Sequence, residues 1–423
     1  MKRINPLTSI SDIEVENKIN ILNKQFHFPI KDSIVKNIFN QTDSTSTIEL
    51  YTLADAIENC NKISSNWVEK HIKLIEKDAN NAYGSLWEII FGGILIDSGV
   101  NVILEKDSNP GIDVSANIWN TDFHFSLKRY ESSTHYNNLG LFFDKLKPII
   151  EKFKEEITNI IIYLQNYPDS TTLSNIEKKL REELKKSNQS NTNTYSINEP
   201  GKFSITINHN INQYNEINRT HKCSSFNIIL VSELHKNEKK NLFDKITDAI
   251  DNLTDHKKNG INIIGIHLNQ FSPIDAIEKF INEYFQTHQT SKIDGIILYQ
   301  PNIFINSSMN NITHVIRFIK NPKSTMPNPN GQIPVIKVTT GNISMQSIPN
   351  VINISPTLIL PLTEKYYFQY GKIYTDMKDE NGKKSGNCFK IGPNFSVIPT
   401  LQENGKILAI EGKFSKTDRL FLI

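Results

Sequence analysis

Hydrophobic and polar residues alternate in two neighbouring segments, residues 111–118 and 123–128. Successive side chains of a β-strand point to opposite faces, so each segment predicts a strand with one apolar face and one polar face. The four residues between the two segments suit a tight hairpin. The apolar positions are Ile112, Val114, Ala116 and Ile118 in the first strand and Phe123, Phe125 and Leu127 in the second.

The same pattern predicts how the two strands pair. With the turn centred on Asn120 and Thr121, every apolar residue lies opposite another apolar residue, and a slip by one residue would destroy that match. In this register Asp113 lies opposite Lys128, so the polar face carries a carboxylate beside an ammonium group. The other polar side chains on that face are Ser115, Asn117, His124 and Ser126.

Residues 86–95 are apolar almost all round, which predicts a largely buried helix. Glu88 is the one charged residue in that segment. It lies on a narrow strip of non-apolar residues, where small neighbours would allow a backbone, an ion or a phosphate to approach. Gly99 is placed to end the helix, and residues 100–104 predict the first strand. The strip consists of Gly84, Ser85, Glu88 and Gly92.

Two further elements follow the hairpin. Residues 131–140 predict a polar loop, and residues 141–157 have the spacing of an amphipathic helix. Pro148 should kink or divide this helix, because proline lacks an N–H donor. Residues 159–164 are a short apolar run and predict a fourth strand. The expected buried side of the helix is Phe142, Phe143, Leu146, Ile149, Ile150 and Phe153.

This αβββαβ order resembles the core of the PD-(D/E)xK phosphodiesterase superfamily, to which restriction endonucleases belong. The resemblance covers about residues 80–165 and rests on Pro-Gly-Ile-Asp at 110–113 and Ser-Leu-Lys at 126–128. Two features depart from the family pattern. The proline precedes Asp113 by three residues, and Ser126 takes the place of the second acid. Glu88 is the natural candidate to supply the missing carboxylate.

The resemblance implies a metal-dependent endonuclease. Asp113 and Glu88 would hold Mg²⁺, for which Mn²⁺ can substitute, and the Leu127 carbonyl would be a third ligand. Lys128 would orient or deprotonate the attacking water and neutralise developing charge, with Ser126 beside it to bind water or phosphate. The implied substrate is nucleic acid, with double-stranded DNA favoured, in restriction or anti-phage defence. The implied nucleic-acid contacts are His124, Arg129, Lys145 and Lys147.

Other interpretations of the same residues remain open. An aspartate opposite a lysine is also typical of a cross-strand ion pair on a solvated face, and lysines on an amphipathic helix often only face water. Because Ser126 replaces an acid, the chain could be a catalytically inactive nuclease-fold protein. Such a protein would bind nucleic acid or a protein partner as a regulatory or structural subunit, or associate with a second copy of itself.

The whole chain predicts an α/β protein with a helical N-terminal region and an α/β plus β-rich C-terminal half. Residues 171–186 predict a charged, solvent-facing helix, and the polar segment 187–201 is the candidate linker. Asn404 and Gly405 predict a hairpin. The four expected regions are 1–79 (helical), 80–186 (restriction-endonuclease-like core), 202–365 (second α/β domain) and 366–423 (β-rich).

Helices are expected before the core and within the second domain. Asp55 and Glu58 lie three residues apart on one N-terminal helix, where they are either two metal ligands or solvated acids. The expected N-terminal helices are 11–23, 33–39, 47–60 and 67–77. The expected elements of the second domain are strands 203–207, 226–231, 261–268 and 293–299 and helices 238–252 and 273–287.

Composition narrows the function classes. The 423 residues carry a formal net charge of +2, so nucleic-acid contacts must come from a local patch. The three cysteines form no CxxC pair, which argues against structural zinc and disulfides. No apolar run matches a membrane span or a signal peptide, so we expect a cytoplasmic protein without a membrane partner. No phosphate-binding glycine loop of the Walker or Rossmann type is present. A second acid-x-Lys match, at residues 411–413, lacks a preceding acid-bearing helix.

Overall fold

The computed structural model describes residues 3–5, 7, 10–26, 34–77, 79–104, 111–118, 120–131, 133–153, 157–187, 194–209, 227–253, 260–269, 272–305, 310–324, 364–371, 373–378, 384–390, 396–398, 401–403 and 406–408. These residues form a mixed α/β structure with two large sheets and two small ones. The helices are α1 (Asp12–Gln25), α2 (Ile34–Phe39), α3 (Ser44–Ile63), α4 (Ser65–Lys77), α5 (Ala79–Asp97), α6 (Thr134–Ile150), α7 (Ser170–Ser187), α9 (Asn237–Asn252) and α10 (Ile274–Thr287), with a 3₁₀ turn at Glu151–Phe153.

In the described part of the chain, six strands form one large sheet and five form the other. They are β1 (Asn101–Leu104), β2 (Val114–Ile118), β3 (Thr121–Tyr130), β4 (Ile157–Leu164), β5 (Thr194–Glu199), β6 (Phe203–His209), β7 (Asn227–Ser232), β8 (Ile261–Leu268), β9 (Gly295–Ile305), β10 (Asn310–Lys320) and β11 (Tyr366–Gly371). The small sheets are made of β12 (Ile373–Lys378), β13 (Lys384–Lys390), β14 (Ser396–Ile398), β15 (Leu401–Glu403) and β16 (Lys406–Leu408).

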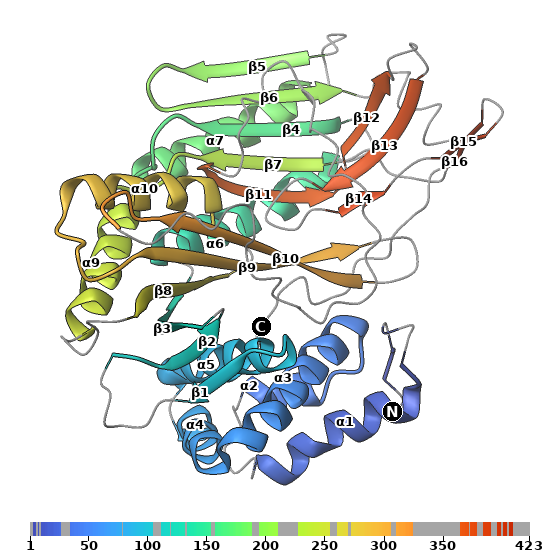
Figure 1. The fold of residues 1–423 in the computed structure, drawn as a ribbon. Helices are drawn as coiled ribbons and strands as arrows, with labels where there is room; N and C mark the ends of the chain where they lie inside the picture. Colours follow the sequence, from blue (N-terminus) through green and yellow to red (C-terminus); the bar gives the residue numbers. More distant parts are fainter. Residues whose placement is uncertain are drawn as a thin grey trace.

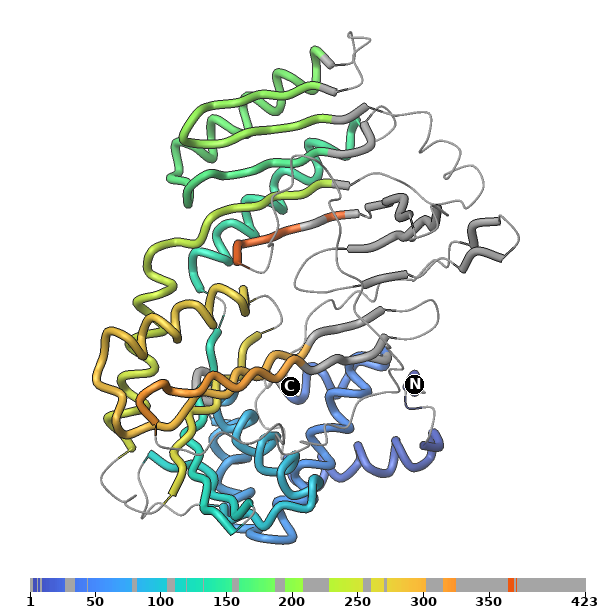
Figure 2. Tube along the Cα trace, turned by 45° about the horizontal axis from the view of Figure 1, so that its top comes forward, coloured from blue at the N-terminus to red at the C-terminus, as the bar shows by residue number. Residues whose placement is uncertain are grey.

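The N-terminal helices α1 to α5 gather at one end of the molecule, and β4 to β7 lie at the other (Figures 1 and 2). The expected helices before the core are confirmed. The central helix α5 is buried, as its nearly continuous apolar sequence predicted, with Trp87 and Ile90 in the core. It ends at Gly99, which has a φ of +74°. The N–H of Gly99 donates to the Ile96 carbonyl and that of Val100 to the Leu95 carbonyl, which is the Schellman arrangement.

The first large sheet has the strand order β1-β2-β3-β8-β9-β10. Strands β1, β2 and β3 pair antiparallel, β3 pairs parallel with β8, and β8 pairs parallel with β9. Helix α5 packs on one face, where Phe125 and Leu127 join the core of the N-terminal helices. Helices α9 and α10 pack on the other face, against Ile264 and Ile266 of β8.

The second large sheet has the order β11-β7-β4-β6-β5, in which β4 and β7 are parallel. Helices α6 and α7 contribute to a separate core on this sheet. The buried residues of α6 include all the predicted positions except Phe153, which is partly buried. The charged helix α7 is not simply solvent-facing, because Ile176, Leu180 and Leu184 are fully buried against the sheet.

The position of strand β4 differs from the expected one. It forms close to residues 159–164 as predicted, but it lies in the second sheet, and β8 takes the place beside β3. The physical reason is that β4 is apolar on both faces: Ile160 and Ile162 are buried on one side and Ile161 on the other. Such a run fits the interior of any sheet, so its sequence does not select a partner.

The second large sheet combines strands from residues 80–186 and from residues 202–365. Strand β5 forms within the expected linker and pairs antiparallel with β6, so one sheet spans the predicted boundary. Helix α6 begins at Thr134 rather than at residue 141, because the Ser133 side chain caps it by accepting from the Tyr136 N–H. The helix continues past Pro148 to Ile150, so the proline does not divide it.

A buried carboxylate joins the two large sheets. Glu238, in the first turn of α9, accepts a hydrogen bond from the Tyr130 hydroxyl of β3 at 2.6 Å and another from the Tyr366 hydroxyl of β11. Its side chain is only 5% exposed, so these bonds replace water. Because β3 and β11 belong to different sheets, this carboxylate fixes one sheet against the other.

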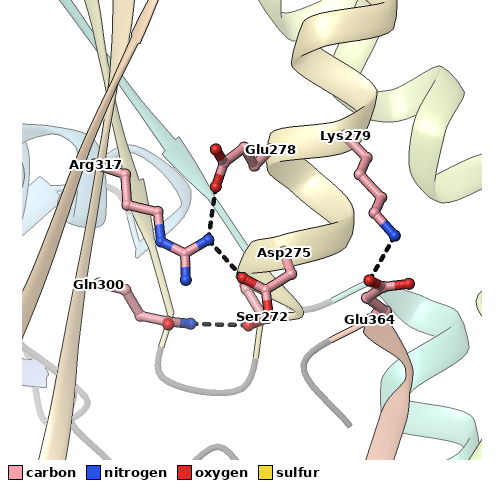
Figure 3. Close-up of polar contacts among 7 residues, drawn as sticks. All are labelled: Ser272, Asp275, Glu278, Lys279, Gln300, Arg317 and Glu364. Atoms are coloured by element: carbon pink, nitrogen blue, oxygen red, sulfur yellow. Dashed lines mark hydrogen bonds and ion pairs between the residues drawn. The ribbon is translucent and has the colours of Figure 1, made fainter. Parts of the chain in front are cut away.

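Polar contacts also hold α10 on the first sheet (Figure 3). Arg317 of β10 forms ion pairs with Asp275, at 2.5 Å, and Glu278, at 2.6 Å, both on α10. Beneath them the Gln300 amide donates to the Ser272 carbonyl at 2.8 Å. Asp275 and Glu278 therefore share one basic partner, Arg317, across the face of the sheet.

The described part of the C-terminal region is β-like, as expected. Strands β15 and β16 pair antiparallel with Glu403 opposite Lys406, and the predicted turn residues Asn404 and Gly405 lie outside the described residues. Residues 411–413 lie outside the described residues. Within the described part of the chain, no helix combines the length and the apolar character needed to cross a membrane.

We expect Gly93→Ala to destabilise the protein by about 1–3 kcal/mol, the usual cost of overpacking. A Cβ at position 93 would lie 2.5 Å from the Cα of Ala56, so α3 and α5 would have to separate. The matched control is Gly84→Ala on the same helix, where a Cβ meets nothing within 4 Å. The control should instead stabilise by about 0.5–1 kcal/mol through helix propensity. Urea unfolding measures both; equal effects of the two variants would contradict this account.

Candidate active site at the end of the β2–β3 hairpin

The observed pairing of β2 with β3 differs by two residues from the predicted register. Ile118 pairs with Thr121, Ala116 with Phe123 and Val114 with Phe125, so the turn is centred one residue earlier than expected. Asn120 takes a φ of +60°, a left-handed conformation that asparagine tolerates better than most residues. A shift by two residues keeps every side chain on its predicted face, which explains why the hydrophobic pattern could not distinguish the two registers.

This register moves Asp113 away from its predicted place opposite Lys128. The Asp113 N–H donates to the Phe125 carbonyl at 2.9 Å, and its Oδ2 accepts from the Leu127 N–H at 2.6 Å. Asp113 therefore lies at the position opposite Ser126, just before β2 begins. Lys128 remains close enough for its charge to act on the Asp113 carboxylate.

Glu88 reaches the same place from α5, although it is distant in sequence. Its carboxylate acts electrostatically on Asp113, so the two acids share one environment. The Glu88 side chain is 23% exposed, which leaves it accessible from solvent. Its Oε2 contacts the Nε2 of His71, on α4, at 2.5 Å. The sequence had assigned no role to His71. His71 lies on the apolar face of the amphipathic helix α4, and a polar residue at such a position is a sequence feature that could have identified it.

The pKa of Asp113 is raised from 3.8 to about 6. Burial is the largest cause, because it penalises the charged form, and repulsion from the Glu88 carboxylate is the second. Lys128, the Leu127 N–H bond and His71 act in the opposite direction. An acid held in an unfavourable environment by specific neighbours is typical of functional sites.

The donor atoms fit a hard divalent cation such as Mg²⁺. Among the described residues, the second oxygens of Asp113 and Glu88 accept no hydrogen bond. The Leu127 carbonyl points to the same side of β3 as its N–H, which is towards Asp113. Ser126 is fully buried, and its Oγ has no hydrogen-bond partner within the described structure.

No group of three or more His, Cys, Asp or Glu side chains suited to a metal occurs in the described ranges. That finding concerns only sites with three or more such side chains. It is compatible with Mg²⁺, which is commonly held by one or two carboxylates and completes its octahedron with water.

The predicted nucleic-acid contacts are scattered. His124 is half-buried and its Nδ1 bonds to the Ser115 hydroxyl at 2.8 Å. Arg129 points into the protein, where it forms an ion pair with Glu131 at 2.7 Å and lies over the Tyr83 ring. The remaining two lie on α6, which belongs to the second sheet: Lys145 is exposed, and Lys147 forms an ion pair with Asp144. The structure therefore does not bring these four side chains together.

Other candidate residues have structural partners. Asp55 and Glu58 both pair with Lys18 of α1. His267 is buried against Trp87 and Tyr299. Three more side chains of chemically reactive types also have partners in the fold. Asp294 accepts from the Asn262 N–H and the Ser324 hydroxyl, the buried Cys60 thiol, whose pKa burial raises to about 12, contacts the Ile89 carbonyl, and the His235 ring stacks on His135.

Comparisons of the chain with protein-family models, with curated proteins and with solved structures found no match. The site is therefore interpreted from its own geometry.

The raised pKa of Asp113 predicts a pH-dependent stability. The folded state holds an extra proton between about pH 4 and pH 6, so the free energy of unfolding falls as pH rises through that window. Asp113→Asn has no charge to bury and keeps an acceptor for the Leu127 N–H. We expect it to stabilise the protein by about 1–3 kcal/mol at pH 7 and by little at pH 4.

Urea unfolding at pH 4, 5, 6 and 7 measures this effect. The control is Asp122→Asn, because Asp122 is an exposed acid on the same hairpin, and its side chain accepts a hydrogen bond from Asn117 across the turn. Loss of stability in Asp113→Asn at pH 7 would show that the carboxylate contributes to the fold.

Proposed function

We propose that the protein is a metal-dependent phosphodiesterase that cuts nucleic acid, with DNA as the favoured substrate. The observation that carries this proposal is the convergence of Asp113, Glu88 and Lys128 from a loop, a helix and a strand, with a raised pKa at Asp113. Two acids and a lysine at one partly exposed site can supply the metal ligands and the positive charge that promote phosphodiester hydrolysis.

Each residue has a distinct role in this proposal. Asp113 and Glu88 would hold Mg²⁺ through the carboxylate oxygens that accept no hydrogen bond from the described residues, and the Leu127 carbonyl would complete the protein ligands. When bound, the cation supplies activation of a water and relief of charge on the phosphate. The Lys128 ammonium would orient the attacking water and offset charge that develops on the phosphate oxygens.

The topology also supports the resemblance to PD-(D/E)xK enzymes. Strand β8 pairs parallel with β3, and the preceding helix α9 packs on the same sheet. The spatial order α5–β1–β2–β3–α9–β8 therefore corresponds to the expected helix, three strands, helix and strand. The second sheet interrupts this order between β3 and α9. Such an inserted module is a natural place for recognition of a target or partner, and restriction or anti-phage defence remains the proposed setting.

Ser126 favours a second candidate function. It stands where the family carries an acid, it is fully buried, and its hydroxyl supplies no charge. A site weakened in this way fits a protein that keeps the nuclease fold only to bind nucleic acid or a protein partner. Calorimetry with Mn²⁺ separates the two functions, because the enzyme requires a metal site that depends on Asp113 and Glu88.

The test is cleavage of supercoiled plasmid, linear duplex DNA, single-stranded DNA and RNA in the presence of Mg²⁺ or Mn²⁺. We expect Asp113→Ala and Lys128→Met each to lower the rate by at least about 100-fold, the usual effect of removing one group that stabilises charge in the transition state. Asp122→Asn, on the exposed end of the same hairpin, should cut at the wild-type rate.

Folding of each variant is checked first by circular dichroism. Cutting that survives in both Asp113→Ala and Lys128→Met would place the chemistry elsewhere in the chain. Cutting that continues in EDTA would exclude the metal. An absence of cutting on every substrate, with Mn²⁺ binding also absent, would favour the binding-only function.

A further inference from the structure

His71 is held in a single orientation beside the candidate active site. Its ring lies against Trp67, with the two ring centroids 3.9 Å apart, and its side chain is only 6% exposed. The ring Nδ1 contacts the Trp67 carbonyl oxygen at 2.8 Å, within the same helix. A carbonyl oxygen only accepts, so Nδ1 donates this bond. The other ring nitrogen, Nε2, faces the Glu88 carboxylate, which also accepts when it is ionised, so Nε2 donates to it and the ring then carries a proton on both nitrogens.

This contact gives the two oxygens of the Glu88 carboxylate different environments. Oε2 lies 2.5 Å from Nε2 of His71, whereas Oε1 accepts no hydrogen bond from the residues that the structure describes. An oxygen engaged by a rigid, buried ring is poorly available to a cation. Glu88 therefore presents one free oxygen in a defined direction.

We infer that His71 is a positioning residue that restricts Glu88 to single-oxygen binding of a divalent cation, and thereby favours Mg²⁺ or Mn²⁺ over Ca²⁺. This inference rests on the proposed function, because it requires a cation at Asp113 and Glu88. Mg²⁺ requires six ligands in a near-ideal octahedron, whereas Ca²⁺ takes six to eight and commonly uses both oxygens of a carboxylate. Hydrogen-bonded partners of ligating carboxylates typically contribute about 10–100-fold to metal affinity.

Charged groups from several elements surround this pair. Lys128 of β3 and Asp113 before β2 act on the same site, and the Glu88 carboxylate is the group that His71 contacts directly. A purely structural role for His71 would instead come from its packing between Trp67 and the core of α4. The two roles differ in whether the effect of His71 requires Glu88.

The experiment is titration of the full chain with Mn²⁺ and with Ca²⁺ by calorimetry, without nucleic acid. The variants are His71→Ala, His71→Gln, Glu88→Gln, Asp113→Asn and the His71→Ala/Glu88→Gln double variant, each checked by circular dichroism and thermal unfolding. We expect His71→Ala to weaken Mn²⁺ binding about 10–100-fold and to lower the ratio of Mn²⁺ to Ca²⁺ affinity. His71→Gln, whose amide can still donate to Glu88, should recover most of the loss.

The double variant decides between positioning and general destabilisation. If His71 acts through Glu88, removing its side chain has no further effect in Glu88→Gln. Equal weakening of Mn²⁺ binding in the wild-type and Glu88→Gln backgrounds would overturn the inference, as would an unchanged Mn²⁺ affinity in His71→Ala. Wild-type Mn²⁺ binding that is absent, or that is insensitive to Asp113→Asn, would instead overturn the proposed function and this inference together.

Discussion

Strand β3 is the constraint on which the rest of the structure depends. It is hydrogen-bonded on both edges, antiparallel to β2 and parallel to β8, so it cannot slide without breaking two ladders. Phe125 and Leu127 anchor one of its faces in the core of the N-terminal helices, and Tyr130 anchors the other face against α9. Residues 126–128 therefore lie on a strand that is hydrogen-bonded at both edges and packed on both faces. Both the Leu127 N–H that holds Asp113 and the Tyr130 hydroxyl that holds Glu238 depend on that rigidity.

The environment of Asp113 is unfavourable for a charge, and the fold supplies only partial compensation. Burial and the Glu88 carboxylate oppose ionisation, whereas the Leu127 N–H and the Lys128 ammonium support it. A protein selected for stability alone would place an apolar or amide side chain there. Two acids and a lysine at one point therefore lower stability, and the proposed function gives this arrangement a reason.

The second sheet is inserted into the first between β3 and β8. The chain leaves after Tyr130, forms the sheet that contains β4 to β7, and returns through α9. Glu238 stands at this return and bonds to tyrosines from both sheets, Tyr130 and Tyr366. Tyr130 lies two residues beyond Lys128 on the same strand, so this contact between the two sheets lies close in sequence to the candidate active site.

The sequence by itself determined the elements and the faces of their side chains. Apolar periodicity predicted α5, the β2–β3 hairpin, β8 and α9, and it put Asp113, Ser126 and Lys128 on one polar face. These features depend on local geometry, which repeats every two or 3.6 residues. Only the tertiary structure decided the register, because a shift by two residues leaves every face unchanged. The tertiary structure also decided that β8 rather than β4 lies beside β3, because both strands are apolar on two faces and either could fill that place. It likewise brought His71 of α4 into contact with Glu88 of α5. Partners distant in the chain are chosen by packing of the whole core, which no local pattern records.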